Sequence, residues 1–137
     1  MSDHLLDTSI LIRYLRRVPG YRDMLRSMGV EGWLYISAVT RLEIVRGMRE
    51  SERQATFALL DSLETIQMTS EVADLAGELI RLWRPKGVIL GDADAVIAAS
   101  ALKHGLALVT TNARHFPMPD LIVFQADEEG RLTPREK

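Results

Sequence analysis

Short apolar runs alternate with helical patterns along almost the whole chain, and this alternation restricts the fold more than any other feature. Strands are expected at residues 5–6, 34–36, 65–68, 106–109 and 121–124. Helices are expected at residues 8–15, 21–28, 38–48, 53–63, 70–83 and 93–104. Strands that alternate with helices form a mainly parallel sheet covered on both faces. The sequence therefore predicts a three-layer α/β/α domain with a mainly parallel central sheet.

Turn residues and apolar spacing add local detail to this prediction. Helix ends or breaks are expected at Pro19-Gly20, Gly29, Pro85-Lys86-Gly87 and Gly105. The helix over residues 38–48 carries Ala38, Leu42 and Val45 at helical spacing, so we expect these three to face inward. The helix over residues 93–104 is apolar nearly all round, which predicts burial on several sides.

Length and composition limit the classes of protein that the chain can belong to. A chain of 137 residues with 47% hydrophobic residues is enough for one domain with a core. We expect this domain to cover residues 1–126, followed by a charged, flexible tail at residues 127–137. There is no cysteine, no apolar run of the roughly 20 residues that a membrane helix needs, and no signal-peptide pattern. The sequence predicts a cytoplasmic protein that does not enter the membrane.

Three acidic residues recur where helices follow strands. Asp7 comes directly after the first expected strand, Glu43 lies about a turn and a half into the helix after the second, and Asp94 opens the apolar helix. Ligands of open α/β sheets bind outside the carboxyl ends of the strands. We therefore expect Asp7, Glu43 and Asp94 to converge at that edge, where they would hold a metal ion or a catalytic water.

Each of these acids also has a purely structural interpretation. Asp7 is a good helix N-cap, and Glu43 can pair with Arg46 at i,i+3. Asp92 and Asp94 both flank the start of a helix whose first backbone donors need a cap. We favour Asp94 as the ligand and Asp92 as the cap or a supporting residue, and the choice between them stays open.

Polar residues also follow the last buried strand. Thr110, Thr111 and Asn112 suit an ordinary turn, and they also suit a role in holding a metal-bound water or a phosphate oxygen. His115 is interpreted either as a surface residue or as a proton carrier near the site.

Carboxylates collected from several strand ends match the needs of a hard divalent cation. Mg²⁺ is usually held by one or two carboxylates together with waters and substrate phosphate. Zinc is disfavoured because the chain has no cysteine and its histidines lack zinc spacing. A bound Mg²⁺ or Mn²⁺ activates water and polarises a phosphoryl oxygen, so metal-assisted phosphodiester hydrolysis is the expected chemistry.

Four segments of the chain resemble the PIN-domain nucleases, and within them the VapC-type toxins of toxin–antitoxin operons. The segments are LLDTSILI around Asp7, ISAVTRLEIVRG around Glu43, DADAVIAASALKHGLALVTTN around Asp94, and NARHF after it. They stand in the right order and at the right distances, and the likeness extends from Leu5 to Phe124.

The resemblance implies an endoribonuclease that depends on Mg²⁺ or Mn²⁺. Carried over by position, Asp7, Glu43 and Asp94 would bind the metal. Thr8, Ser9 and Thr110 match the small hydroxyl positions that support those acids. Such proteins are usually homodimers, and a small antitoxin encoded alongside usually neutralises them.

The chain departs from the family pattern at one place. The family often has a fourth acid near the NARHF element, where this chain has Asn112 and His115. The departure leaves one or two metal ions as open alternatives, with Asn112 able to position water through its amide. Arg46, Arg114 and His115 are the candidate RNA contacts.

A PIN-like module that binds RNA or a partner without efficient cleavage is the alternative function. The neutral fourth position and the net charge of −2 favour it. The three acids argue against it, because a module that only binds has little reason to keep mutually repelling carboxylates together. Hydrolysis is the favoured interpretation.

Overall fold

The structure is a computed structural model that describes residues 3–135, and it contains a six-stranded sheet. The strands are β1 (His4–Leu6), β2 (Leu34–Ser37), β3 (Glu64–Ile66), β4 (Ala107–Thr110), β5 (Val123–Ala126) and β6 (Leu132–Pro134). The helices are α1 (Thr8–Leu15), α2 (Tyr21–Glu31), α3 (Ala38–Gly47), α4 (Arg53–Asp61), α5 (Ser70–Trp83) and α6 (Asp92–His104). Short 3-10 helices are η1 (Glu50–Glu52), η2 (Arg84–Lys86) and η3 (Ala113–His115). The predicted α/β class is confirmed.

Strand order explains why one point on the sheet edge is special. The order is β3-β2-β1-β4-β5-β6, with parallel pairing from β3 through β5 and antiparallel pairing of β6. The chain starts in the middle, moves outward to β3, and then returns to the other side of β1 to form β4. A parallel sheet opens a crevice where the strand order reverses in this way, at the carboxyl ends of the strands. Here that point lies between β1 and β4.

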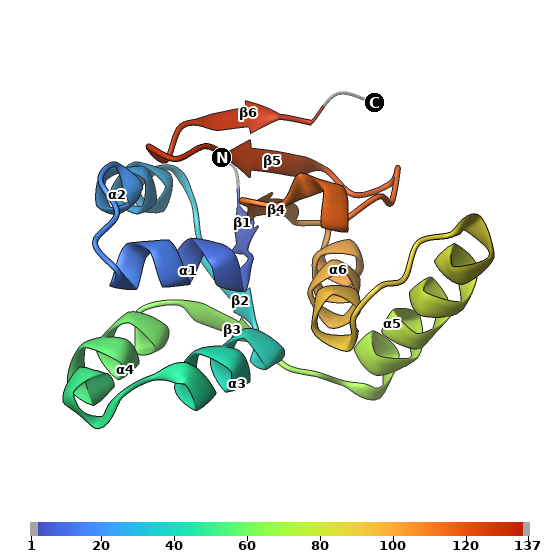
Figure 1. Cartoon of the computed structure of the whole chain (residues 1–137), viewed down its shortest axis with the longest axis horizontal. Coiled ribbons are helices and arrows are strands. Elements are labelled where there is room, and N and C mark those ends of the chain that lie inside the picture. Colours follow the sequence, from blue (N-terminus) through green and yellow to red (C-terminus); the bar gives the residue numbers. More distant parts are fainter. Residues whose placement is uncertain (1–2, 136–137) are drawn as a thin grey trace.

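Helices cover both faces of the sheet (Figure 1). Helices α5 and α6 pack on one face, in a cluster that includes Leu5 and Leu108. Helices α1, α2 and α4 pack on the other, in a cluster that includes Leu6 and Val109. Neighbouring strand residues contribute to opposite clusters because their side chains alternate between the faces. None of the helices in the described residues is long and apolar enough to cross a membrane.

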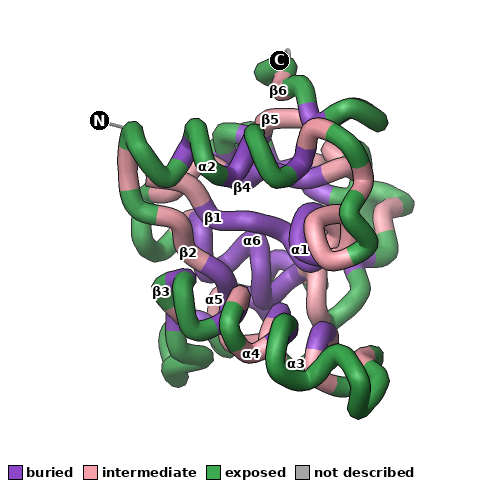
Figure 2. Tube along the Cα trace, turned by 90° about the vertical axis from the view of Figure 1, so that its left-hand side faces the viewer, coloured by how far each residue is buried: buried purple, intermediate pink, exposed green. Residues whose placement is uncertain are grey.

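Helix α6 is buried on several sides, as predicted. Every residue from Ala95 to Ala101 is buried, and Figure 2 shows this burial continuing into β1 and β4. Alanines on several sides let the helix lie close to the sheet and to α5. Gly105 ends it at φ 63°, which confirms the expected left-handed cap.

Two details of the helices differ from the prediction. Helix α2 continues through Gly29 to Glu31 and is followed by Gly32, because Met28 is buried and the exposed Gly29 adopts a helical conformation at a modest cost. In α3 the side chain of Leu42 is 57% exposed, while Thr40 and Ile44 are buried. Helix α3 packs against both α1 and α6, so the face that it buries is not the most apolar one.

The C-terminal part of the chain also differs from the prediction. The strand expected at residues 121–124 is β5 at Val123–Ala126, and it is not the edge of the sheet. Residues from 127 onward, expected to be a flexible tail, form a turn and then β6, which pairs with β5. The carboxylate of Asp127 accepts backbone N–H groups of Glu129 and Arg131 in that turn. Polar local bonding of this kind builds a hairpin without an apolar signal. Residues 136 and 137 lie outside the described residues.

Contacts with α2 hold this C-terminal hairpin in place. The Tyr21 hydroxyl donates to the Asp127 carbonyl at 2.7 Å. Gly20 has φ 94°, and a Cβ atom there would lie 1.7 Å from the Glu129 carbonyl oxygen. Glycine is therefore required at position 20, both for its backbone conformation and for this close approach.

Arg135 tests how firmly the hairpin is attached. Its guanidinium donates to the carbonyls of Phe116, Met118 and Leu121, and burial lowers its pKa. We expect Arg135→Ala to reduce the free energy of unfolding by about 1–3 kcal/mol, because three carbonyls lose a charged donor. Urea denaturation measures the change. Arg131→Ala removes an exposed arginine from the same hairpin and should cost less than about 0.5 kcal/mol. Equal losses in the two variants would contradict the attachment.

Candidate active site at the carboxyl edge of the sheet

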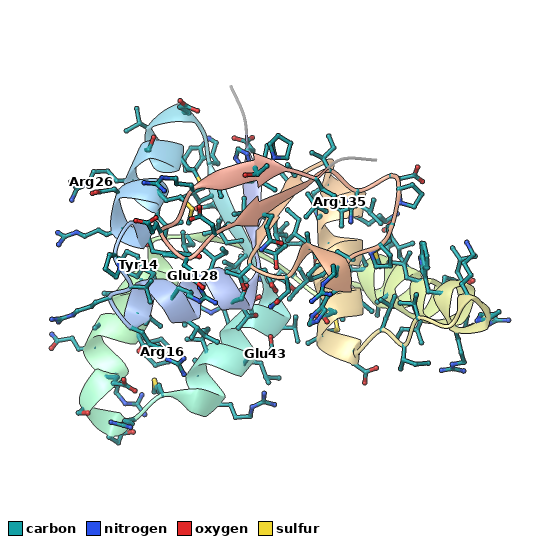
Figure 3. All side chains as sticks on the ribbon, turned by 45° about the horizontal axis from the view of Figure 1, so that its top comes forward. Tyr14, Arg16, Arg26, Glu43, Glu128 and Arg135 are labelled. Atoms are coloured by element: carbon teal, nitrogen blue, oxygen red, sulfur yellow. The ribbon has the colours of Figure 1, made fainter. Side chains whose placement is uncertain are left out.

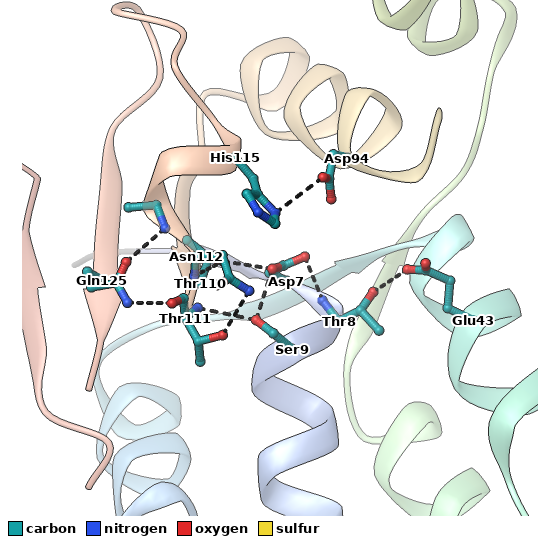
Figure 4. A network of polar contacts seen from close by, with 11 residues as sticks. Asp7, Thr8, Ser9, Glu43, Asp94, Thr110, Thr111, Asn112, His115 and Gln125 are labelled. Atoms are coloured by element: carbon teal, nitrogen blue, oxygen red, sulfur yellow. Dashed lines mark hydrogen bonds and ion pairs between the residues drawn. The ribbon is translucent and has the colours of Figure 1, made fainter. Parts of the chain in front are cut away.

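Asp7 lies at the point where the strand order reverses. Its backbone N–H donates to the Val109 carbonyl of β4 at 2.9 Å, which ties the end of β1 to its neighbour. One carboxylate oxygen accepts the backbone N–H of Thr8 at 2.9 Å, so Asp7 is the N-cap of α1. The other oxygen accepts the hydroxyls of Ser9 at 2.9 Å and Thr110 at 2.7 Å (Figure 4). The predicted capping role is confirmed.

The environment of Asp7 is unusual for a cap because the side chain is buried. Burial raises the pKa of the Asp7 carboxyl, and the hydrogen bonds from Thr110, Ser9 and Thr8 oppose that shift. The charge of Glu43 raises the pKa further. The three donors thus stabilise a carboxylate that burial and a neighbouring negative charge both disfavour.

Glu43 reaches the same site from α3. The Thr8 hydroxyl donates to Glu43 Oε1 at 2.7 Å and lies 3.0 Å from the hydroxyl oxygen of Thr40. Among residues 3–135 no ion pair joins Glu43 to Arg46, so the structural alternative for Glu43 is not realised. Thr8 separates Glu43 from Asp7 and binds both of them, one through its backbone and one through its hydroxyl.

Asp94 approaches from α6, in the first turn of the helix. Burial raises the pKa of its half-buried carboxyl, and the charges of Asp7 and Glu43 raise it further. His115 on η3 opposes this shift, with its Nδ1 atom 3.6 Å from Asp94 Oδ2. The charges of the three acids therefore interact. Figure 4 shows Asp94 on the side of Asp7 opposite to β5, the strand that carries Gln125.

Asp92 does not have the expected capping role. The N-cap of α6 is Gly91, which makes no side-chain cap bond, and Asp92 is the first residue of the helix. Asp92 is exposed and its direction differs from that of Asp94, which is two residues further along the helix. The acidic first turn still suits the positive end of the helix dipole.

The loop after β4 is organised by a residue that the sequence prediction missed. Gln125 on β5 donates to the Thr111 carbonyl at 2.5 Å and accepts the Ala113 N–H at 2.8 Å, so it holds the chain on both sides of Asn112. Asn112 itself donates its backbone N–H to the Thr110 hydroxyl at 3.0 Å. A glutamine inside an otherwise apolar strand was the available signal. Thr40, buried beside Thr8, was also missed.

The acids form an electrostatic group but not a finished ligand set. Among the described residues no cluster of three or more histidine, aspartate or glutamate side chains is arranged so that it could hold a metal ion as it stands. The reason is visible in the contacts: Asp7 faces hydroxyls, Glu43 faces Thr8 and Asp94 faces His115. The donor set still fits a hard divalent cation, because burial first and then repulsion between the acids raise the pKa values of Asp7 and Asp94, and a cation would offset both effects.

One of the predicted RNA contacts, His115, lies at the site beside Asp94. Arg114 and His115 are exposed on η3, and Arg46 is exposed on α3. Glu43 also lines a groove of about 680 Å³ that extends along α1, α3 and α4. Neither Asp7 nor Asp94 lines that groove, so the groove meets the group of acids on the Glu43 side.

Comparison with known proteins gives the family. The PIN domain model matches residues 4–119. Ribonuclease VapC10 of Mycobacterium tuberculosis is 40% identical over 114 residues, covering 83% of this chain and 86% of that protein. Ribonuclease VapC19 of the same organism is 36% identical over 119 residues, covering 85% and 95%. VapBC2 from Rickettsia felis, solved bound to a promoter DNA fragment, superposes with a TM-score of 0.76 at 24% identity, over 88% of this chain and 96% of that one.

The matched residues include all three acids and the strands and helices that carry them. The chain belongs to the PIN-domain family, within the group of VapC proteins. The expected resemblance is confirmed.

The raised pKa of Asp94 leads to a stability prediction. A carboxyl whose folded-state pKa is raised destabilises the fold when it is ionised, so its cost appears as pH rises above its ordinary value of 3.8. Asparagine cannot ionise. We expect Asp94→Asn to raise the melting temperature at pH 7 in the presence of chelator, and to raise it less at pH 4. Thermal unfolding at the two pH values measures this difference. A lower melting temperature of the variant at pH 7 would contradict the destabilisation of ionised Asp94 by burial and by the neighbouring acids.

Proposed function

We propose that this protein is an endoribonuclease that hydrolyses RNA phosphodiesters with Mg²⁺ or Mn²⁺ and acts as the toxin of a type II toxin–antitoxin pair. The observation that carries the proposal is the meeting of Asp7, Glu43 and Asp94 at the reversal point of a PIN-family sheet, where two of them have raised pKa values. The relatives are named ribonucleases, and that name supports the reaction class.

Asp7, Glu43 and Asp94 are the residues that would hold the ion. The ion, when bound, supplies activation of water and neutralisation of charge on the phosphoryl oxygens. Asp7 follows β1, Glu43 lies within α3 and Asp94 lies in the first turn of α6, so the fold brings their charges together without any local sequence clustering. Their repulsion before binding adds to the gain when a cation arrives.

The surrounding residues orient and prepare these acids. Thr110 and Ser9 donate to one oxygen of Asp7 and so fix the plane of its carboxylate, while Thr8 fixes Glu43. His115 lies beside Asp94 and is the nearest group able to carry a proton at the site. Asn112 lies on the same loop, where its amide would position water. Asp92 would act only through its negative charge at the start of α6.

A single metal ion is the simpler proposal for this chain. Asn112 and His115 occupy the region where a fourth acid would stand, so the negative charge available for a second ion is lower. Titration of the protein by calorimetry with Mn²⁺ reports the number of ions bound.

The partners follow from the same family. Structures similar in fold are complexes of a VapC protein with its VapB partner, including those from Rickettsia felis and from Haemophilus influenzae. We propose that a small antitoxin encoded alongside binds this chain, that the active form is a homodimer, and that it acts in the cytoplasm. Size-exclusion chromatography with light scattering tests the homodimer.

Cleavage of RNA is the direct test of the proposed reaction. We expect the purified protein to cleave single-stranded RNA with Mg²⁺ or Mn²⁺, and Asp7→Asn or Asp94→Asn to lower the rate at least about a hundredfold, because each removes a metal ligand. Gel electrophoresis of labelled RNA measures the rate. Asp74→Asn changes an exposed acid on α5 and is the matched control. Cleavage that persists in excess chelator would refute the metal-dependent mechanism.

Metal binding has an independent readout in stability. An ion that binds only the folded protein stabilises it by about 2.7 kcal/mol at a hundred times its dissociation constant. We expect Mn²⁺ to raise the melting temperature of the natural protein and to have little effect on Asp94→Asn. Equal shifts in both proteins would show that the ion binds elsewhere.

Gln125 provides a test of the loop after β4. Gln125→Met keeps the side-chain length but removes both hydrogen bonds to the loop around Asn112. We expect kcat to fall by about 10–100-fold with little change in KM, because the loop that carries His115 loses its support. Steady-state kinetics on one RNA separates the two parameters. A change confined to KM would instead assign Gln125 to substrate binding.

A further inference from the structure

The groove beside Glu43 has an apolar floor and a cationic rim. It has a volume of about 680 Å³, and Ile12, Leu15 and Ile44 are among its lining residues. Arginines 16, 17 and 49 line it as well (Figure 3 labels Arg16 and Glu43). The groove thus combines surfaces for apolar groups with guanidinium groups, and its lining includes Glu43, one of the three acids of the candidate site.

The three arginines have no counter-charge of their own in the described part of the chain. Arg16, Arg17 and Arg49 are exposed, and none of them forms an ion pair among residues 3–135. Glu52 is the other acid of the groove, and its carboxylate accepts the backbone N–H of Arg49 at 2.7 Å. Three guanidinium groups therefore outnumber the two carboxylates in a protein whose net charge is −2.

Arg17 stands in a backbone conformation that favours glycine. It has φ 59° and is the one non-glycine residue with positive φ in the described chain. The Val18 N–H bonds to the Arg13 carbonyl and the Arg17 N–H bonds to the Tyr14 carbonyl, which is the hydrogen-bond pattern of a Schellman motif ending α1. Glycine is the usual residue at this position, so arginine is present there despite a conformational cost.

We propose that Arg16, Arg17 and Arg49 bind the phosphates of a single-stranded RNA along this groove and position the strand for the group of acids to which Glu43 belongs. This inference rests on the proposed ribonuclease function and names the surface that binds its substrate. Guanidinium groups pair with phosphates through planar, charge-assisted hydrogen bonds, and the apolar floor accommodates the faces of bases. Glu43 belongs to both the groove and the group of acids, so a strand lying in the groove passes directly to the site.

Salt dependence of RNA binding tests the groove separately from cleavage. The probe is a fluorescein-labelled, 20-nucleotide single-stranded RNA of mixed sequence, and its binding is measured by anisotropy in EDTA between 50 and 200 mM KCl. We expect the triple variant Arg16→Ala/Arg17→Ala/Arg49→Ala to bind about 10–100-fold more weakly. The slope of log K against log salt should fall by about 0.7 for each phosphate that the variant no longer neutralises, or about 2 in all.

A matched triple variant controls for net charge. Arg81→Ala/Arg84→Ala/Lys86→Ala also removes three positive charges, here from the end of α5 and from η2, on the other face of the sheet. We expect its affinity and salt slope to stay close to those of the natural protein. If both triple variants lose the same affinity, the effect is one of overall charge and the groove inference is wrong.

Substitutions of Arg17 separate binding from folding. Arg17→Gly should raise the melting temperature by a few degrees, because glycine relieves the left-handed conformation, and yet weaken RNA binding. Arg17→Lys keeps the positive charge and should retain most of the binding. A purely structural Arg17 would give a Gly variant that is stabilised and binds RNA normally, and that result would overturn the role assigned to it.

The remaining outcomes distinguish the two proposals. RNA binding that depends on the three arginines without any metal-dependent cleavage would refute the ribonuclease function and keep the groove. Metal-dependent cleavage with unchanged binding in the triple variant would refute the groove and keep the function. Normal RNA binding by a triple variant that no longer binds the antitoxin would assign the groove to that protein and overturn the inference.

Discussion

The burial of carboxylates that also repel one another, at one edge of the sheet, is the constraint on which the site depends. Asp7 is buried, and burial alone would favour its neutral form. Three hydrogen bonds from Thr8, Ser9 and Thr110 oppose that tendency. The order of the strands makes these bonds possible, because β1 and β4 are neighbours at the reversal point and the residues that follow each strand meet there. The electrostatic environment of Asp7 therefore depends directly on the order of the strands.

Asp7 and Thr110 show what the sequence is able to predict. Each follows an apolar run, and parallel strands deliver the residues at their carboxyl ends to one edge, so their proximity follows from the alternation of strands and helices. The burial of α6 was predictable for a related reason, since apolar residues on all sides of a helix leave no face for solvent. These features depend on periodicity, which a single sequence records directly.

Other features depend on tertiary contacts that periodicity does not record. The buried face of α3 contains Thr40 rather than Leu42, because the helix lies against α1 and α6 and not flat on the sheet. The hairpin that forms β6 is built from backbone bonds to Asp127, so its sequence is as polar as that of a flexible tail. In the sequence, Gln125 is only a single polar residue within a strand. Its role is evident only from its two hydrogen bonds to the loop after β4.

Each carboxylate of the site has its own protein partner, and this has a physical consequence. Asp7 is bound by hydroxyls, Glu43 by Thr8 and Asp94 by His115, and these contacts moderate the repulsion. A cation that binds here has to compete with these partners. Its binding is favoured because it relieves the repulsion that remains among the acids. The fold, more than the hydrogen bonds and the ion pair within the site, thus keeps the three acids close together. In the proposed function, loss of any one acid would remove both a ligand and part of the electrostatic attraction for the ion.

Electrostatics also acts over a larger part of the protein, through the positions of its charged side chains. The net charge of −2 argues against nucleic-acid binding only if charges are spread evenly, and here they are not. Arg16, Arg17 and Arg49 line one groove without ionic partners in residues 3–135, and Glu43 of the candidate site lines the same groove. A polyanion approaching such a surface meets attraction along the groove and repulsion at the acids. In the proposed function, a bound divalent ion would lower this repulsion, so occupancy of the ion and productive seating of the strand would be coupled electrostatically.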